Sequence, residues 1–193
     1  MKNTARIAMV LVPGSACAHH FMENELPRSF AEGFLSGLGH PIIGLDHLAF
    51  IVAAGFFLAL IPRGGLLGIA ALIAGTLGGA ALHLAGIDIP GGEAAIAISV
   101  ILIGAAVLAR RSIELHWVMG ALAVAGILHG HAYAESIFGA EPAPLVAYLA
   151  GFSLIQLAIA SAAYFLHARL PRQSALVVGS VVGAIGIAFL VAG

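Results

Sequence analysis

Long apolar stretches separated by short polar turns make up most of this chain. Six of these stretches have roughly the 20 residues that a helix needs to cross the hydrocarbon core of a membrane. Turns such as Pro62-Arg63-Gly64-Gly65 separate them. The pattern predicts membrane-spanning helices at residues 41–61, 66–85, 93–109, 116–134, 145–167 and 176–192.

A shorter predicted helix precedes the first span. Ser29 and Glu32 have the spacing of a capping box, which predicts a helix over residues 30–37. That helix is too short to cross a membrane alone. Because Pro41 disfavours helical geometry at His40, we expect either an interfacial helix or the outer half of a first helix that is broken near Pro41.

The start of the chain has the features of a cleavable signal peptide. Lys2 and Arg6 precede an apolar run at residues 7–12, and Ala16-Cys17-Ala18 fits a small-residue cleavage site. We therefore predict a signal peptide at residues 1–18 and a single six-helix transmembrane domain at residues 19–193. His19 and His20 would then begin the mature chain, and the sequence assigns them no role.

Composition supports a membrane protein and argues against several other classes. Hydrophobic residues make up 61% of the chain and charged residues only 9%, which is not typical of a soluble domain. The net charge of -1 argues against a nucleic-acid surface, which needs clustered Lys and Arg. The single cysteine, Cys17, excludes an internal disulfide framework and a cysteine-rich metal site. We expect an all-α, polytopic helical bundle in the lipid bilayer.

The charges in the loops predict the orientation of the helices. If the mature N-terminus is outside, the outer segments carry Arg28 and most of the acidic residues. The inner loops then carry the arginines Arg63, Arg110, Arg111, Arg169 and Arg172. This distribution follows the positive-inside rule. We therefore expect a protein of the bacterial inner membrane with both mature termini in the periplasm.

Ionisable side chains collect near the outer ends of the predicted spans. They are His40, Asp46 and His47 in the first span, His83 in the second, and His129, His131 and Glu135 in the fourth. A charged group at the membrane centre costs about 2.5–3.5 kcal/mol, so such groups usually face the bundle interior and pair. Gly75 and Gly79 lie on the same helix face as His83 and predict that it points inward. These groups together predict a cation site.

Helix geometry limits how the residues of the first span can share an ion. On a straight helix, His40 and His47 would lie ~10.5 Å apart along the axis, too far for two nitrogens each ~2.1 Å from one metal. A break at Pro41 or Gly44 could fold His40 back, or His40 could act earlier on the path inward. Asp46 and His47 lie ~100° apart around the helix, so we expect one to ligate while the other orients it.

The fourth span supplies the other predicted half of the site. His131 and Glu135 lie four residues apart and share one face, whereas His129 points elsewhere. We hypothesise that His131 and Glu135 meet Asp46 and His47 across the bundle, with His129 in the same pocket or on the path into it. Imidazole and carboxylate suit Ni, Co, Zn, Cu(II) and Fe. The expected partner is a divalent transition-metal ion, and no permanently bound cofactor is expected.

These motifs resemble those of the HupE/UreJ family of bacterial nickel and cobalt permeases. The resemblance rests on His40-Pro41-x-x-Gly44-x-Asp46-His47 and on His129-Gly130-His131-Ala132 with Glu135, together with six spans and a signal peptide. It covers nearly the whole mature chain. Larger nickel/cobalt transporters carry a His-x4-Asp-His motif, and the spacing here is one residue longer. The resemblance implies import of Ni(II) or Co(II) and a link to hydrogenase or urease maturation.

Two other functions are compatible with the same residues. An intramembrane Zn-dependent hydrolase would bind zinc through three of these groups and a water in the open position. Ser36 lies nearby, but residues 33–37 do not form a G-x-S-x-G nucleophile elbow. A metal-binding accessory or sensor protein would bind the ion without moving it across the membrane.

Overall fold

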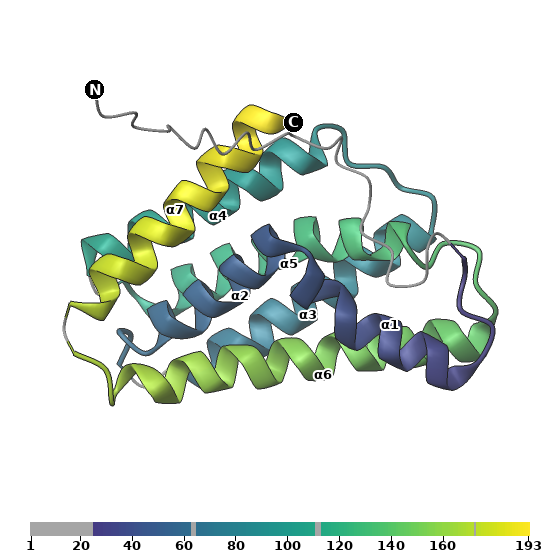
Figure 1. Cartoon of the computed structure of the whole chain (residues 1–193), viewed down its shortest axis with the longest axis horizontal. Helices are drawn as coiled ribbons and strands as arrows, with labels where there is room; N and C mark the ends of the chain where they lie inside the picture. Colours follow the sequence, from purple (N-terminus) through teal and green to yellow (C-terminus); the bar gives the residue numbers. More distant parts are fainter. Residues whose placement is uncertain (1–24, 63–64, 111–112, 172) are drawn as a thin grey trace, which may run out of the picture.

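The computed structural model describes residues 25–62, 65–110, 113–171 and 173–193, and within these residues all regular structure is α-helical (Figure 1). The predicted signal peptide, His19 and His20 lie outside the described residues. The helices are α1 (Phe30–Ile43), α2 (Leu45–Leu58), α3 (Gly65–Leu84), α4 (Gly92–Ala109), α5 (Leu115–Glu135), α6 (Pro142–His167) and α7 (Ser174–Ala192). The ends of α3 to α7 agree with the last five predicted spans to within about three residues.

The first span is broken, but the break is at Gly44 and not at Pro41. α1 and α2 meet there at an angle of 80°. The amide of Gly44 donates to the carbonyl of His40 at 3.1 Å, so helical hydrogen bonding continues past Pro41. Pro41 removes only one donor from the last turn of α1, whereas Gly44 has an extended ψ of 100° that ends the helix. His40 is therefore helical, contrary to the prediction.

α1 and α2 together cross the bundle alongside α6 (Figure 1). Gly33 of α1 packs against the backbone of Pro144 near the start of α6, and Gly55 of α2 packs against the backbone of Ala160 further along it. The bent pair thus follows α6 along its length and counts as one span. With the five long apolar helices α3 to α7, this gives the predicted six crossings.

α2 lies at the centre of the bundle. Most of its residues are buried, including Phe50, Ile51 and Leu58, and it contacts α1, α3, α4, α6 and α7. A helix that is apolar on all sides suits such a position. The first turn of α2 carries Asp46 and His47, so the fold places these two residues inside the bundle and near one end of it.

Glycines allow neighbouring helices to approach closely. Gly75 and Gly79 of α3 lie against the backbone of Ala123 and Ile127 of α5, so the two helices run parallel. This contact is the small-residue packing that the sequence predicts, and it brings the ends of α3 and α5 to the same end of the bundle. α7 lies against α4 in the same close manner, with Gly183 beside Gly104 (Figure 1).

The outer faces of the helices are apolar. Large hydrophobic side chains such as Trp117, Val124, Val177 and Val191 are more than half exposed. In water such a surface would promote aggregation, whereas lipid chains cover it at no cost. The chain therefore has the architecture of a multi-pass membrane protein.

Candidate metal site

The five predicted histidine ligands fall into two groups on different sides of α5. The central cluster consists of His40, His47, Ser99, His129 and Tyr133 and surrounds the start of α2. The loop cluster consists of His83, Asp88 and His131 and lies where α3 and α5 end.

His47 and His129 form the core of the central cluster. Nδ1 of His47 on α2 lies 2.8 Å from Nδ1 of His129 on α5. Both side chains are buried, with exposed fractions of 7% and 1%. Two nitrogens in adjacent positions around one metal, each ~2.1 Å from it, lie about 3 Å apart. In this structure the two nitrogens share a hydrogen bond. The same spacing would suit two ligands of a single ion once the proton of that bond is displaced.

Ser99 on α4 determines which nitrogen of His129 carries the proton. The hydroxyl of Ser99 donates to the carbonyl of Ile96 at 2.7 Å, so its oxygen accepts from Nε2 of His129 at 2.9 Å. This hydrogen-bond network assigns the proton to Nε2 and leaves a lone pair on Nδ1. Ser99 thus presents the atom that faces His47 as a metal ligand.

His40 joins the cluster through the bend at Gly44. Its ring centroid lies 6.0 Å from that of His47, much closer than the ~10.5 Å that a straight helix would impose. The hydroxyl of Ser136 donates to the carbonyl of Tyr133 at 2.9 Å, so Ser136 accepts from Nδ1 of His40 at 3.1 Å. The break therefore brings the two histidines together, and Gly44 is the residue that provides it.

The ring of Tyr133 contacts both histidines of the first span. Its centroid lies 5.1 Å from that of His40 and 4.6 Å from that of His47. The side chain is fully buried, and among the described residues its hydroxyl has no hydrogen-bond partner. A buried hydroxyl without a partner carries a desolvation cost of about 1–3 kcal/mol. A buried hydroxyl without a partner, on a ring that contacts two imidazoles, fits a site for a hydrated cation.

Asp46 stabilises its own helix. Its Oδ1 accepts from the backbone amide of His47 at 2.9 Å at the start of α2. This contact joins the carboxylate to the backbone of His47, and an orienting role of Asp46 toward the His47 ring stays a prediction. The half-buried carboxylate still supplies negative charge beside the central cluster, where it offsets the charge of a divalent ion.

A cavity of about 310 Å³ lies next to Ser99. It is lined by apolar residues of α2, α4 and α5, and it reaches Trp117 in the first turn of α5. Ser99 therefore borders both the central cluster and a space that extends toward the opposite end of the bundle.

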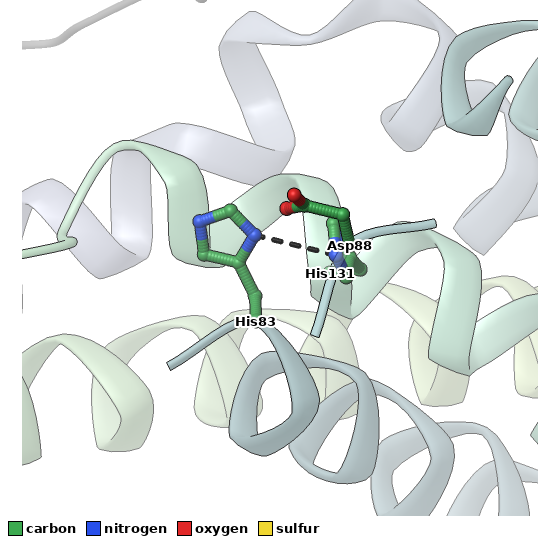
Figure 2. Close-up of side chains that lie close together, drawn as sticks. All are labelled: His83, Asp88 and His131. Carbon is green, nitrogen blue, oxygen red and sulfur yellow. Dashed lines mark hydrogen bonds between the residues drawn. The ribbon is translucent and has the colours of Figure 1, made fainter. Parts of the chain in front are cut away.

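The loop cluster is shown in Figure 2. Nδ1 of His83 lies 3.3 Å from Nε2 of His131, and the two rings are nearly perpendicular at 88°. One ligand atom from each of His83, Asp88 and His131 lies within 4.8 Å of the others. Asp88 comes from the connection between α3 and α4 and is exposed.

The structure pairs the histidines of α5 differently from the hypothesis. His129, and not His131, contacts His47, while His131 contacts His83 and Glu135 is exposed. The reason is that the face of α5 that packs on α3 places His131 beside His83, which leaves His129 to face α2 and α4. Both histidines of α5 thus lie in clusters, but not in the same one.

Sequence reasoning missed several polar residues of these clusters. Tyr133 lies four residues after His129, so helical spacing could have placed both on one face. Asp88 lies in the turn between two predicted spans, five residues after His83, and this short separation could have indicated it as a partner of His83. The roles of Ser99 and Ser136 could not be predicted from the sequence, because single serines are common in apolar helices. Only the three-dimensional contacts identify them.

Comparisons with known proteins agree with this architecture. Residues 7–193 match the family described as HupE / UreJ protein. The chain is 30% identical over 152 residues to "Protein HupE" of Rhizobium leguminosarum bv. viciae, an alignment that covers 78% of this chain and 75% of the relative. No solved structure matches the chain significantly. On the strength of a match that covers nearly its whole length, the chain belongs to the HupE/UreJ family.

Proposed function

We propose that this protein is a secondary permease that imports Ni(II), or alternatively Co(II), across the bacterial inner membrane from the periplasm. The observation that carries the proposal is the buried pair of Nδ1 atoms of His47 and His129, 2.8 Å apart at the centre of the bundle. Family membership supports it. The imported ion would serve hydrogenase or urease maturation.

The residues of the central cluster suit a transported ion better than a resident one. His47 and His129 supply neutral nitrogen ligands, and His40 and Asp46 lie beside them. Imidazole with carboxylate favours Ni(II) and Co(II) over Mg(II) and Ca(II). The ligands come from α1, α2 and α5, so movement of one helix relative to another can break the set and release the ion.

Uptake by vesicles tests the proposal. Reconstituted wild-type protein is expected to accumulate ⁶³Ni(II), and His47→Ala and Asp46→Asn are expected to abolish uptake. His116→Ala is the matched control, because His116 is exposed at the start of α5 and far along that helix from His129. Uptake at the wild-type level in both His47→Ala and Asp46→Asn would contradict the proposal.

The same preparation distinguishes the two alternatives. A Zn-dependent hydrolase would show hydrolytic activity in detergent that is lost with His47→Ala, and we expect no such activity. An accessory or sensor protein would bind nickel at equilibrium but fail to transport it when reconstituted alone. The helical architecture and the family membership favour the permease.

A further inference from the structure

The loop cluster has the geometry of a metal site in its own right. Nδ1 of His83 and Nε2 of His131 lie 3.3 Å apart. Two nitrogens that bind one metal at ~2.1 Å in a tetrahedral arrangement lie about 3.4 Å apart. A carboxylate oxygen of Asp88 belongs to the same group, within 4.8 Å of one ring nitrogen of each histidine. Figure 2 shows the carboxylate of Asp88 beside the two rings.

We propose that His83, Asp88 and His131 form a second site for a divalent transition-metal ion, separate from the site that carries the transported ion. Two imidazoles and one carboxylate favour Ni(II), Co(II), Zn(II) or Cu(II), with water completing the coordination. This site goes beyond the proposed function and does not depend on it, since an ion can bind here whether or not the protein transports one.

The two histidines are held in place by the fold. His83 lies in the last turn of α3 and His131 in the C-terminal part of α5, and these parallel helices are locked together by Gly75 and Gly79. Their relative position is therefore set before any ion binds, which lowers the entropic cost of binding. His131 is buried and His83 half-buried, so both rings are restrained.

Binding at this site has a defined proton requirement. Nε2 of His131 lies 2.9 Å from the carbonyl of Ile87, which can only accept, so Nε2 carries the proton in this geometry. An ion that binds Nε2 must displace that proton to Nδ1 or to water. The Ile87 carbonyl then faces the ion as an additional oxygen donor.

The backbone of α5 separates this site from the central cluster. His129 and His131 are two residues apart, so their side chains point ~200° apart around the helix. Between them, on one side of the helix, Gly130 packs against the backbone of Thr76 and leaves no room for a side chain. The close packing of α3 on α5 thus separates the loop cluster from His129 on that side.

A bound ion would tie the connection between α3 and α4 to the two helices. Asp88 is exposed and lies between Gly86 and Gly91, which both adopt positive φ. Coordination of Asp88 joins this turn to His83 on α3 and His131 on α5. The turn leads directly into α4, which carries Ser99, so the second ion would stabilise the approach to the helix that supports His129.

Cobalt binding by the tag-free, full-length protein tests this site. Equilibrium dialysis gives the number of Co(II) ions bound, and visible absorption reports their coordination. His83→Ala and Asp88→Asn are each expected to bind one Co(II) ion fewer, or to bind that ion with an affinity that is lower by about tenfold or more. His47→Ala is expected to keep that ion. Glu93→Gln, which changes an exposed acid at the start of α4, is the matched control.

Two results would overturn the second site. One is the same number of bound ions, affinity and spectrum in wild type, His83→Ala and Asp88→Asn. The other is loss of the same ion in His47→Ala and His83→Ala, which would indicate one shared site. If His83→Ala does not fold, the result for Asp88→Asn alone tests the second site, because a change at the exposed Asp88 leaves the packing of the bundle intact. A protein that binds at the loop cluster but shows no uptake would contradict the permease and leave this site standing.

Discussion

Ser99 is the residue whose role follows most directly from the hydrogen bonds. Its hydroxyl is committed to the Ile96 carbonyl, so it holds Nε2–H of His129 and directs the lone pair on Nδ1 toward His47. Ser99→Ala removes this support without touching the ligands. Loss of a group that orients a metal ligand typically weakens binding about 10- to 100-fold. We expect KM for nickel uptake to rise by about that factor.

The control for this change is Ser153→Ala. Ser153 lies on α6, is half-buried, and donates to the Leu149 carbonyl at 2.7 Å, so it makes the same local contact without a histidine partner. Its replacement is expected to leave uptake unchanged. An equal KM in Ser99→Ala and wild type would show that Ser99 does not orient a ligand.

Tyr133 is expected to act through its hydroxyl. Because that hydroxyl is buried without a partner, Tyr133→Phe removes a desolvation cost and should not lower the Tm. If the oxygen faces the hydrated ion, nickel affinity falls by about tenfold. Tyr148→Phe is the contrast, since the Tyr148 hydroxyl donates to the Tyr133 carbonyl at 2.8 Å and its loss should cost about 1 kcal/mol of stability. Unchanged uptake in Tyr133→Phe would contradict a role at the ion.

At the residue scale, the sequence predicted which histidines lie in clusters, but it did not predict which of them contact one another. His40, His47, His83, His129 and His131 all lie in the two clusters. Their partners depend on helix rotation, and a rotation of half a turn exchanges His129 for His131. Periodicity in α5 could not decide this, because glycines and alanines on several faces give no clear apolar stripe.

Gly44 controls the relation between α1 and α2. A Cβ atom at this position would lie 2.6 Å from Cδ2 of the His47 ring and 3.4 Å from Oδ1 of Asp46. Gly44→Ala must therefore displace the ring, and alanine also favours continuation of the helix through the bend. We expect a marked loss of nickel uptake with little loss of stability, because the atoms that must move belong to side chains.

Gly120→Ala is the matched control for this substitution. Gly120 is exposed on α5, and a Cβ there would meet no atom within 4 Å. Uptake by Gly120→Ala should equal that of wild type. Its Tm should be equal to or higher than that of wild type. If Gly44→Ala transports nickel as well as Gly120→Ala does, the bend does not set the position of His47.

At the element scale, the long helices were predictable and the bend was only partly so. Apolar length and turn residues define α3 to α7, because a membrane helix must satisfy its backbone hydrogen bonds internally. The break could be expected at Pro41 or Gly44, and local rules favoured the proline. The backbone shows that the break is at Gly44. Pro41 in the last turn of α1 disturbs one hydrogen bond, whereas the chain changes direction by 80° at Gly44.

At the scale of the whole molecule, both clusters lie toward one end of the bundle and the basic turns lie at the other. His83, Asp88 and His131 mark the end where α3 and α5 finish, while Arg110 and Arg169 follow the ends of α4 and α6. The helices therefore separate the end that carries both histidine clusters from a positively charged end. The positive-inside rule predicts that the charged end faces the cytoplasm.

The proposed import requires that both clusters face the periplasm, and reporter fusions can measure this orientation. Alkaline phosphatase fused after Gly193 or after Gly139 is expected to be active, since both points belong to the end that carries the histidine clusters. A green fluorescent protein fused after Ile113 should fluoresce, because that turn joins the charged ends of α4 and α5. The fusion points serve as controls for one another, since each reporter is active on only one side of the membrane. The opposite pattern would place both clusters at the cytoplasmic face. The histidines would then meet ions from inside the cell, which would contradict import.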